Sequence, residues 1–372
     1  MQQVNSAIAA GNWPSPPAPH LYAWGNNSSG QLGLGNTTQY SSPKQVGSLT
    51  TWSKISGGNS FGMAIKTDGA LWAIGGRNDF GNLGLGSSTY YSSPKQVGSL
   101  TSWSLISCIS NSSLAIKTDG TLWSWGQNSY GQLGLGDRTN RSSPVQVGSL
   151  TTWASISKGW GNFGLAVQTN GTLWSWGGNG NGQLGLGNVT YYSSPKQVGS
   201  LTNWSFVAAG QLQTFAIKTD GTLWSWGANF FGNLGLNNIT SYSSPKQIGA
   251  LTNWLQIAAS YYGAVAVKSN GTLWAWGNNG YGQLGLGNTT NYSSPKQIGA
   301  LTNWLNVTSG ILASIMATQT NGALWSWGYN AQGQLGQSSI ANSYSSPKQV
   351  GSLTTWSSVH AGNYHFYAIA TT

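Results

Sequence analysis

Short runs of alternating apolar and polar residues recur along the whole chain, separated by stretches rich in glycine, asparagine and serine. In residues 122–126 (LWSWG), Trp123 and Trp125 fall on one face of a strand, while Leu122 and Ser124 fall on the other. Both faces of the strand therefore carry large side chains, and both must be covered by other parts of the protein. No stretch has the 3.6-residue periodicity of an amphipathic helix. The pattern predicts an all-β protein made of stacked sheets.

This pattern is repeated seven times. The leucine and aromatic pair that opens the strongest run begins at residues 21, 71, 122, 173, 223, 273 and 324, so the copies are spaced by 50 or 51 residues. Each copy contains a run such as WSKIS, a second such as FGMAIKT, a turn, the LWSWG run, the glycine-rich stretch GQLGLG, and SSPKQVG. We expect about four strands per copy.

An Asp-Gly or Asn-Gly pair separates the second run from the third in six copies. Such pairs between alternating apolar runs predict two-residue hairpin loops, because these loops demand positive φ. The pairs are Asp68-Gly69, Asp119-Gly120, Asn170-Gly171, Asp220-Gly221, Asn270-Gly271 and Asn321-Gly322.

Four-stranded units of roughly 50 residues are typical of propeller blades. The chain ends with WSSVHAGNYHFYAIATT, which matches the first two strands of a copy, and residue 21 begins with the third. One blade is then completed from both termini. We predict a seven-bladed β-propeller over residues 21–372 with four-stranded blades, closed by this shared blade, and a proline-rich docking arm over residues 1–20.

The order LWSWG, N, GQLGLG, P, then AG and K-T-D-G resembles that of the regulator of chromosome condensation repeat family over residues 21–372. A kelch-type propeller has a similar period, but its glycine-pair signature is missing. The resemblance implies a seven-bladed propeller and no single function, because these propellers serve as exchange factors, photoreceptors, ligase appendages and binding modules.

Two functions of that family fit this chain poorly. The exchange factor for the small GTPase Ran uses a projecting wedge and a charged face, and the even repeat spacing leaves no room for a long insertion. The plant UV-B photoreceptor pairs tryptophans with arginines and acids across a dimer surface, whereas only Arg77, Arg138 and Arg141 are present here.

The net charge of +10 comes from 15 Lys and Arg against five Asp and no Glu, so it reflects missing acids more than basic clusters and makes nucleic acid an unlikely partner. One cysteine, Cys108, excludes internal disulfides, and His20, His360 and His365 with so few acids supply no metal set. We expect no metal and no cofactor. The N-terminus has no signal-peptide pattern, and no stretch is apolar enough to insert into a membrane.

The chain offers little material for catalysis. Three aspartates belong to the hairpins, which leaves Asp79 and Asp137 as an improbable carboxylate pair for glycoside hydrolysis. A triad around His365 is less favoured than a plain loop histidine. The G-x-G-x-x-G spacing in GNGNGQLGLG recurs in the copies without a following helix, so it predicts turns and not a phosphate loop. We predict that the protein is not an enzyme.

One repeated position forms a basic ring. A lysine follows the proline of SSPKQ in six copies, and Val145 replaces it in the remaining one. On the outermost strand, proline and lysine prevent another chain from adding a strand, while a functional reading is contact with anionic partners. The lysines are Lys44, Lys95, Lys196, Lys246, Lys296 and Lys348.

The copies differ most between the first and second strands. Because the first strand of a propeller blade is innermost, these turns are expected to surround one mouth of the central channel. They form a predicted ligand-binding rim, where aromatic rings suit sugars and peptides, or else plug the channel. The rim residues are Trp160, Phe163, Tyr261, Tyr262, Tyr364, His365 and Phe366. A second variable patch follows the WG dipeptide, either as packing between blades or as a second contact face, and contains Phe80, Tyr130, Phe230, Phe231 and Tyr281.

Together these features predict a non-enzymatic structural and binding propeller. The near-verbatim copies and the Asn, Ser, Thr and Gly-rich surface resemble repeat propellers of bacteriophage virion proteins and bacterial surface proteins. We expect a capsid decoration or a tail or fibre adhesin that reaches the virion or extracellular surface after lysis. Residues 1–20 would contact other virion or surface proteins, and the rim a host glycan. The alternative is a cytoplasmic adaptor of the exchange-factor type.

Overall fold

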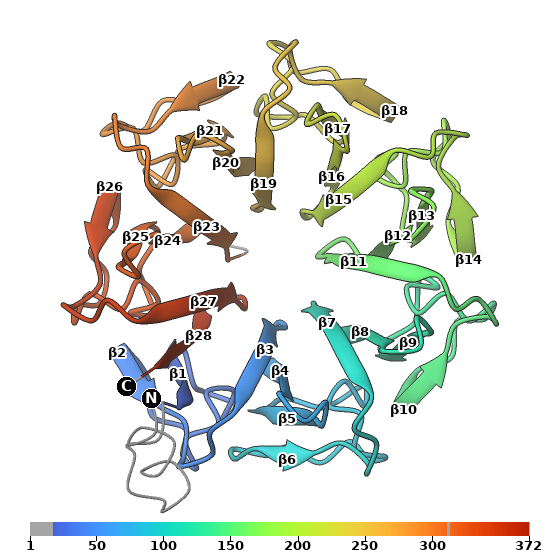
Figure 1. The fold of residues 1–372 in the computed structure, drawn as a ribbon, viewed down its shortest axis with the longest axis vertical. Coiled ribbons are helices and arrows are strands. Elements are labelled where there is room, and N and C mark those ends of the chain that lie inside the picture. Colours follow the sequence, from blue (N-terminus) through green and yellow to red (C-terminus); the bar gives the residue numbers. More distant parts are fainter. Residues whose placement is uncertain (1–17, 311–312, 372) are drawn as a thin grey trace, which may run out of the picture.

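Seven four-stranded antiparallel sheets stand around a central axis (Figure 1). This architecture comes from a computed structural model that describes residues 18–310 and 313–371. The described residues form 28 strands and no helix. The predicted all-β, seven-bladed propeller is therefore confirmed.

Blades 1 to 6, counted from the blade that begins with β3, use their strands in sequence order from the axis outwards, as Figure 1 shows. The first, innermost strands are β3 (Trp52–Gly57), β7 (Trp103–Ile109), β11 (Trp153–Gly159), β15 (Trp204–Ala209), β19 (Trp254–Ala259), β23 (Trp304–Ser309) and β27 (Trp356–Ala361). The second strands are β4 (Phe61–Lys66), β8 (Ser112–Lys117), β12 (Phe163–Gln168), β16 (Gln213–Lys218), β20 (Gly263–Lys268), β24 (Ser314–Gln319) and β28 (His365–Thr371).

The outer half of each blade contains its third and fourth strands. The third strands are β1 (Pro19–Gly25), β5 (Leu71–Gly76), β9 (Leu122–Gly126), β13 (Leu173–Gly177), β17 (Leu223–Gly227), β21 (Leu273–Gly277) and β25 (Leu324–Gly328). The fourth strands are β2 (Tyr40–Gln45), β6 (Lys95–Gln96), β10 (Arg141–Gln146), β14 (Tyr192–Gln197), β18 (Tyr242–Gln247), β22 (Tyr292–Gln297) and β26 (Tyr344–Gln349). We number the blades 1 to 7 from the blade that begins with β3.

Blade 7 closes the ring with strands from both ends of the chain. Its order is β2-β1-β28-β27, and β1 pairs with β28 from Pro19 opposite Thr371 to Gly25 opposite His365. The predicted closure is confirmed. The first strand begins at Pro19, two residues before the predicted boundary, and residues 1–17 of the predicted docking arm lie outside the described residues.

The hairpins between second and third strands form where the sequence predicts them, but their loops are longer. In blade 2, the amide of Gly120 donates to Lys117 O, and the amide of Lys117 donates to Thr121 O, so the loop contains three residues. Gly120 has a φ of +76°, as expected for a type I turn followed by a left-handed glycine. The Asp119 carboxylate accepts hydrogen bonds from the Thr121 amide and hydroxyl. The predicted two-residue length is wrong because only the glycine, and not the aspartate, adopts positive φ.

Adjacent blades are joined by a repeated tryptophan. In blade 5, the Trp276 indole donates to Asn233 O of blade 4 at 3.1 Å, and the ring is fully buried. The same bond is made by Trp24, Trp125, Trp176, Trp226 and Trp327. Blade 1 has Ile74 at this position and lacks the bond; the equivalent carbonyl, Gln31 O of blade 7, accepts instead from the Tyr367 hydroxyl of its own blade. The repeated core position is thus both apolar packing and a link between blades.

Candidate functional site

The two variable connections of each blade lie at the same end of the propeller. Antiparallel strands alternate in direction, so the loops from first to second strand and from third to fourth strand share one end. The Asp-Gly hairpins and the links between blades share the other. We call the first end the loop face.

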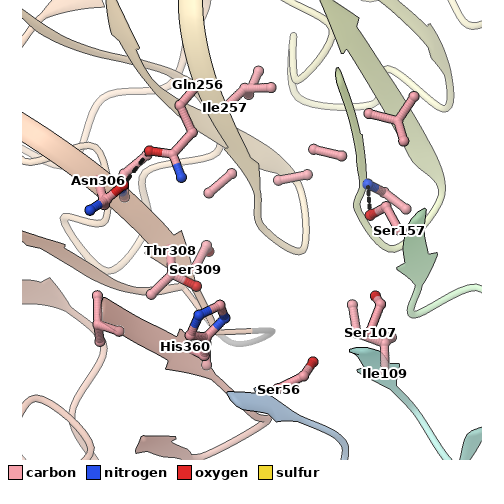
Figure 2. Close-up of a pocket in the computed structure, with 18 of the residues that line it drawn as sticks. Ser56, Ser107, Ile109, Ser157, Gln256, Ile257, Asn306, Thr308, Ser309 and His360 are labelled. Atoms are coloured by element: carbon pink, nitrogen blue, oxygen red, sulfur yellow. Dashed lines mark hydrogen bonds between the residues drawn. The ribbon is translucent and has the colours of Figure 1, made fainter. Parts of the chain in front are cut away.

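The seven first strands surround a central channel that contains a cavity of about 410 Å³. Figure 2 shows hydroxyl and amide side chains around this space, among them Ser56, Ser107, Ser157 and Gln256. Three of the hydroxyls join neighbouring blades: Ser56 Oγ accepts from the amide of Cys108, Ser107 Oγ from that of Lys158, and Ser157 Oγ from that of Ala209. The channel wall mixes these polar groups with apolar side chains such as Ile106, Ile156 and Val207, and three of its hydroxyl groups hold neighbouring blades together.

The channel carries little chemistry for proton transfer. His360 lines it, and desolvation, with a smaller effect of Lys54, lowers the pKa of His360 to about 4. The ring is therefore neutral near pH 7. In the described part of the chain, no group of three or more His, Cys, Asp or Glu side chains is arranged to hold a metal ion. Within residues 18–310 and 313–371, no helix is long and apolar enough to cross a membrane.

Three of the predicted rim residues lie in the core. Phe163, His365 and Phe366 are 0% exposed. Phe163 and His365 are the first residues of β12 and β28, and Phe366 stacks on Trp24 with ring centroids 6.2 Å apart. The prediction that these three decorate the rim is wrong, because each belongs to a strand that is covered on both faces. Burial also lowers the pKa of His365 to about 4.

The other four predicted rim residues, Trp160, Tyr261, Tyr262 and Tyr364, are partly exposed in the loops between first and second strands. The rings of Tyr261 and Tyr262 meet edge to face at 4.3 Å. Burial, followed by the hydrogen bond with Tyr261, raises the pKa of Tyr262. Burial and the neighbouring Tyr329 and Tyr281 raise the pKa of Tyr364.

These rim residues adjoin the second variable patch. Phe231 of blade 4 lies 4.9 Å from the Tyr262 ring of blade 5, and Phe230 lies 6.2 Å from it. Tyr281 of blade 5 lies 4.8 Å from Tyr329 of blade 6. Parts of the two patches that the sequence treats separately are therefore in contact. We call this set the aromatic surface: Phe230, Phe231, Tyr261, Tyr262, Tyr281, Tyr329 and Tyr364.

The aromatic surface is exposed and lies among uncharged loops. Phe230 and Tyr281 expose 52% and 51% of their surface. The loop-face segments that carry the set contain no Asp, Glu, Lys or Arg; they are residues 227–242, 259–263, 277–292, 328–344 and 361–365. Exposed rings without charged neighbours favour contact by stacking and hydrogen bonding over contact by ionic attraction.

The two aspartates outside the hairpins, Asp79 and Asp137, lie in blades 1 and 2, and both already have hydrogen-bond partners. Asp79 accepts hydrogen bonds from Arg77 and Tyr90. Asp137 pairs with Arg141 at 2.5 Å. These contacts lower the pKa of both carboxyl groups, with the Tyr90 hydrogen bond the main cause for Asp79 and the Thr139 amide the main cause for Asp137. The arrangement gives no raised carboxyl pKa that a general acid would use.

The basic ring is exposed on the fourth strands, and each lysine lies over the tyrosine four residues before it in the sequence. The ammonium groups are 4.6–5.7 Å from the ring centroids of Tyr40, Tyr91, Tyr192, Tyr242, Tyr292 and Tyr344. In blade 2 both members of the pair are replaced: Arg141 stands at the tyrosine position and Val145 at the lysine position. The joint change indicates that lysine and tyrosine act as a pair at the sheet edge, which supports edge protection over an anionic site.

Comparison with known proteins agrees with this architecture. The sequence profile of the regulator of chromosome condensation (RCC1) repeat matches seven times, at residues 20–65, 68–116, 119–163, 170–217, 220–267, 270–312 and 321–369. The chain is 30% identical to the ultraviolet-B receptor UVR8 of Arabidopsis thaliana over 185 residues, which are 48% of this chain and 41% of the receptor. The chain spans less than half the length of the curated relatives it matches first.

Solved structures share the fold at low sequence identity. Human WBSCR16 superposes with a TM-score of 0.85 and 21% identity, over 95% of this chain and 99% of that one. Prp20p of Saccharomyces cerevisiae, described together with its binding to Gsp1p and histones, superposes with a TM-score of 0.84 and 19% identity, over 96% of this chain and 92% of that one. At this identity the likeness establishes the fold alone.

Proposed function

The chain belongs to the regulator of chromosome condensation repeat family, and from this premise we propose that it is a non-enzymatic binding propeller that holds its partner on the aromatic surface. The observation that carries the proposal is the contact of Phe231 with Tyr262 and of Tyr281 with Tyr329 across blade boundaries. These contacts join residues of three blades, blades 4, 5 and 6, in an arrangement that no single repeat could form.

The chemistry of this surface favours an uncharged partner. Rings that expose half of their area can stack on the faces of sugars or on apolar side chains, and the surrounding asparagines and glutamines can hydrogen-bond hydroxyls or peptide groups. The partner classes that fit are a neutral glycan and a polar protein loop. Because the loops carry no charge, binding should respond little to salt.

A further part of the proposal concerns the place of action. We place the propeller on a virion or cell surface, as a decoration or adhesin that contacts other surface proteins through residues 1–20. The near-verbatim repeats, the uncharged surface composition and the lack of Glu support this location. Sedimentation of untagged protein in lysate of its source tests it: comigration with large particles supports the location, and comigration with small soluble partners supports the cytoplasmic adaptor.

Binding of purified variants to the partner fraction from that lysate tests the aromatic surface. We expect Tyr262→Ala and Tyr281→Ala each to weaken binding at least about tenfold, because a stacked aromatic anchor contributes about 1.4 kcal/mol or more. Affinity should change less than about threefold between 50 and 200 mM salt, whereas a contact through six lysines would lose orders of magnitude.

Tyr130→Ala is the matched control, because Tyr130 is a 42% exposed loop-face aromatic outside the set. It should bind as the wild type does. Wild-type affinity in the Tyr262 and Tyr281 variants, or a steep salt dependence, would contradict the proposal, and the latter would move attention to the basic ring.

A further inference from the structure

Four equivalent pockets lie between blades on the outer side of the ring. The pocket between blades 3 and 4 has a volume of about 380 Å³ and is walled by Trp204, Trp224, Leu186, Leu201 and Pro245. Its counterparts follow blade 2, blade 4 and blade 5, with volumes of about 330, 380 and 420 Å³. None of the residues that line these four pockets is charged. We call them the side pockets.

Each side pocket includes one exposed leucine from the link between blades. Leu150, Leu201, Leu251 and Leu301 expose 45–49% of their surface. A large apolar side chain so exposed at the mouth of an aromatic pocket, repeated around the ring, is a feature of a contact surface more than of a core.

Each side pocket also includes a tryptophan whose indole N–H has no acceptor. Among the described residues, the indole nitrogens of Trp153, Trp204, Trp254 and Trp304 are buried and have no hydrogen-bond partner. Such a donor is costly to leave unpaired. Trp103 and Trp356, at the same position of blades 2 and 7, also lack a partner, so the unpaired donor is a feature of the repeat that the side pockets share.

The first blade shows where these donors point. There the Trp52 indole donates to Leu49 O at 2.9 Å, because the link adopts a different conformation with a φ of +69° at Thr51. Leu49 is the counterpart of Leu201. By this equivalence, the free N–H of Trp204 faces the link that carries Leu201, which is a wall of the side pocket.

Two indole planes and an apolar wall are elements with which grooves recognise polyproline II segments. Proline rings pack on aromatic faces, and the extended backbone offers carbonyl acceptors that no internal hydrogen bond uses. Residues 11–17 of this chain read GNWPSPP and contain three of its 11 prolines. They lie outside the described residues, directly before β1.

The place where this segment joins the propeller determines whether it can reach a side pocket of its own molecule or only one of another copy. Trp13 is five residues from Ala18, so it can lie at most about 17 Å from the start of blade 7. None of the four side pockets borders blade 7, since the nearest in ring order lies between blades 5 and 6. We propose that the side pockets of one copy bind the proline-rich segment, residues 11–17, of another copy.

Titration of a fluorescein-labelled peptide of residues 9–19 (AAGNWPSPPAP) into the full chain tests this inference. Fluorescence anisotropy and calorimetry should give saturable binding with up to four equivalent sites. Leu201→Asp should lower the number of sites by one, because it puts a charge at the mouth of one pocket. Replacing Leu150, Leu201, Leu251 and Leu301 together by Asp should weaken binding at least tenfold, and so should alanine in place of the three prolines Pro14, Pro16 and Pro17 of the peptide.

Leu49→Asp is the matched control. It makes the same change in the equivalent link before blade 1, where the Trp52 indole already donates to Leu49 O, and it should leave the number of sites unchanged. Thermal melts confirm that each variant is folded. A lack of saturable binding, an unchanged number of sites in Leu201→Asp, or equal binding of the alanine peptide would overturn the inference. So would sites that become available only after the three prolines are replaced in the chain itself, because that result means the segment occupies its own copy.

Discussion

At the residue scale, Lys158 departs most from its repeat. It lies on β11 at the position that Cys108 occupies on β7, and only 1% of it is exposed. Its Nζ lies 2.6 Å from Ser112 Oγ and donates to Gln132 O at 3.2 Å, so two acceptors match the two protons of a neutral amine. Desolvation lowers the pKa of Lys158 to about 7, against a small opposing effect of Cys108.

This pKa predicts a stability that rises with pH. Between the folded pKa near 7 and the unfolded value of 10.5, the unfolded chain binds a proton that the native state does not, so the free energy of unfolding increases with pH. The slope approaches about 1.4 kcal/mol per pH unit, which gives a rise of about 2 kcal/mol from pH 7 to 9. Urea unfolding at several pH values should show this rise in the wild type and not in Lys158→Met. The exposed Lys196→Met should keep it, and an equal slope in Lys158→Met would contradict the assignment.

At the element scale, the glycine-rich connection is fixed by a buried asparagine. In blade 3, Asn179 Oδ1 accepts from the Leu184 amide at 2.9 Å, and its Nδ2 donates to Asn188 O and Thr190 O at 3.0 Å. The acceptor bond recurs in each blade, through Asn27, Asn78, Asn128, Asn229, Asn279 and Asn330. The loop that carries the aromatic surface is therefore shaped by one side chain per repeat.

Asn179→Ala should lower the free energy of unfolding by about 1–3 kcal/mol, because it leaves the buried Leu184 amide and the carbonyls of Asn188 and Thr190 without their partner. Asn179→Asp should be comparably destabilising, since it keeps the acceptor but loses both donor bonds. Asn181→Ala, in the same loop and only partly buried, should change stability by less than about 0.5 kcal/mol. Urea unfolding measures all three, and a mild effect of Asn179→Ala would mean that the glycines alone hold the loop.

The positions that recur in all seven copies made the strands predictable from the sequence. The residues at which each strand begins and ends were harder to predict. Asp-Gly pairs suit both two-residue and three-residue hairpins, so their sequence does not choose the loop length. Phe163 and His365 look like loop residues next to a variable stretch, yet they begin buried strands. The signal was present in the alignment of the copies, because Phe61 occupies the same column as Phe163 and opens its strand in the same way.

At the scale of the whole molecule, function depends on contacts between repeats. That Phe231 meets Tyr262 follows only once the blade order and the shared end of the two loops are known. The side pockets are harder to predict from the sequence. Leu201 lies on the link between blades 3 and 4 and Pro245 lies on β18, and only the packing of the blades brings them together. Repeats thus specify the blade locally, while the binding surfaces arise from how the ring stacks.

Ring closure gives the last prediction. The pairing of β1 with β28 joins the two ends of the chain, so it requires the longest loop closure in the fold. If closure follows the formation of the internal blades, substitutions in blade 7 change mainly the unfolding rate. Ile369 and Ile217 occupy the same column of blades 7 and 4 and are equally buried, at 3% exposed. Replacing either by alanine should destabilise by about 2–5 kcal/mol.

The two variants should then differ in kinetics. Ile369→Ala should accelerate unfolding at least tenfold with little change in folding, whereas Ile217→Ala should mainly slow folding, as stopped-flow measurements in denaturant would resolve. The opposite assignment would mean that the terminal strands pair early and that the internal blades assemble on a ring already closed. Equal effects on both rates would indicate a ring that forms as one cooperative unit, in which closure is not a separate late step.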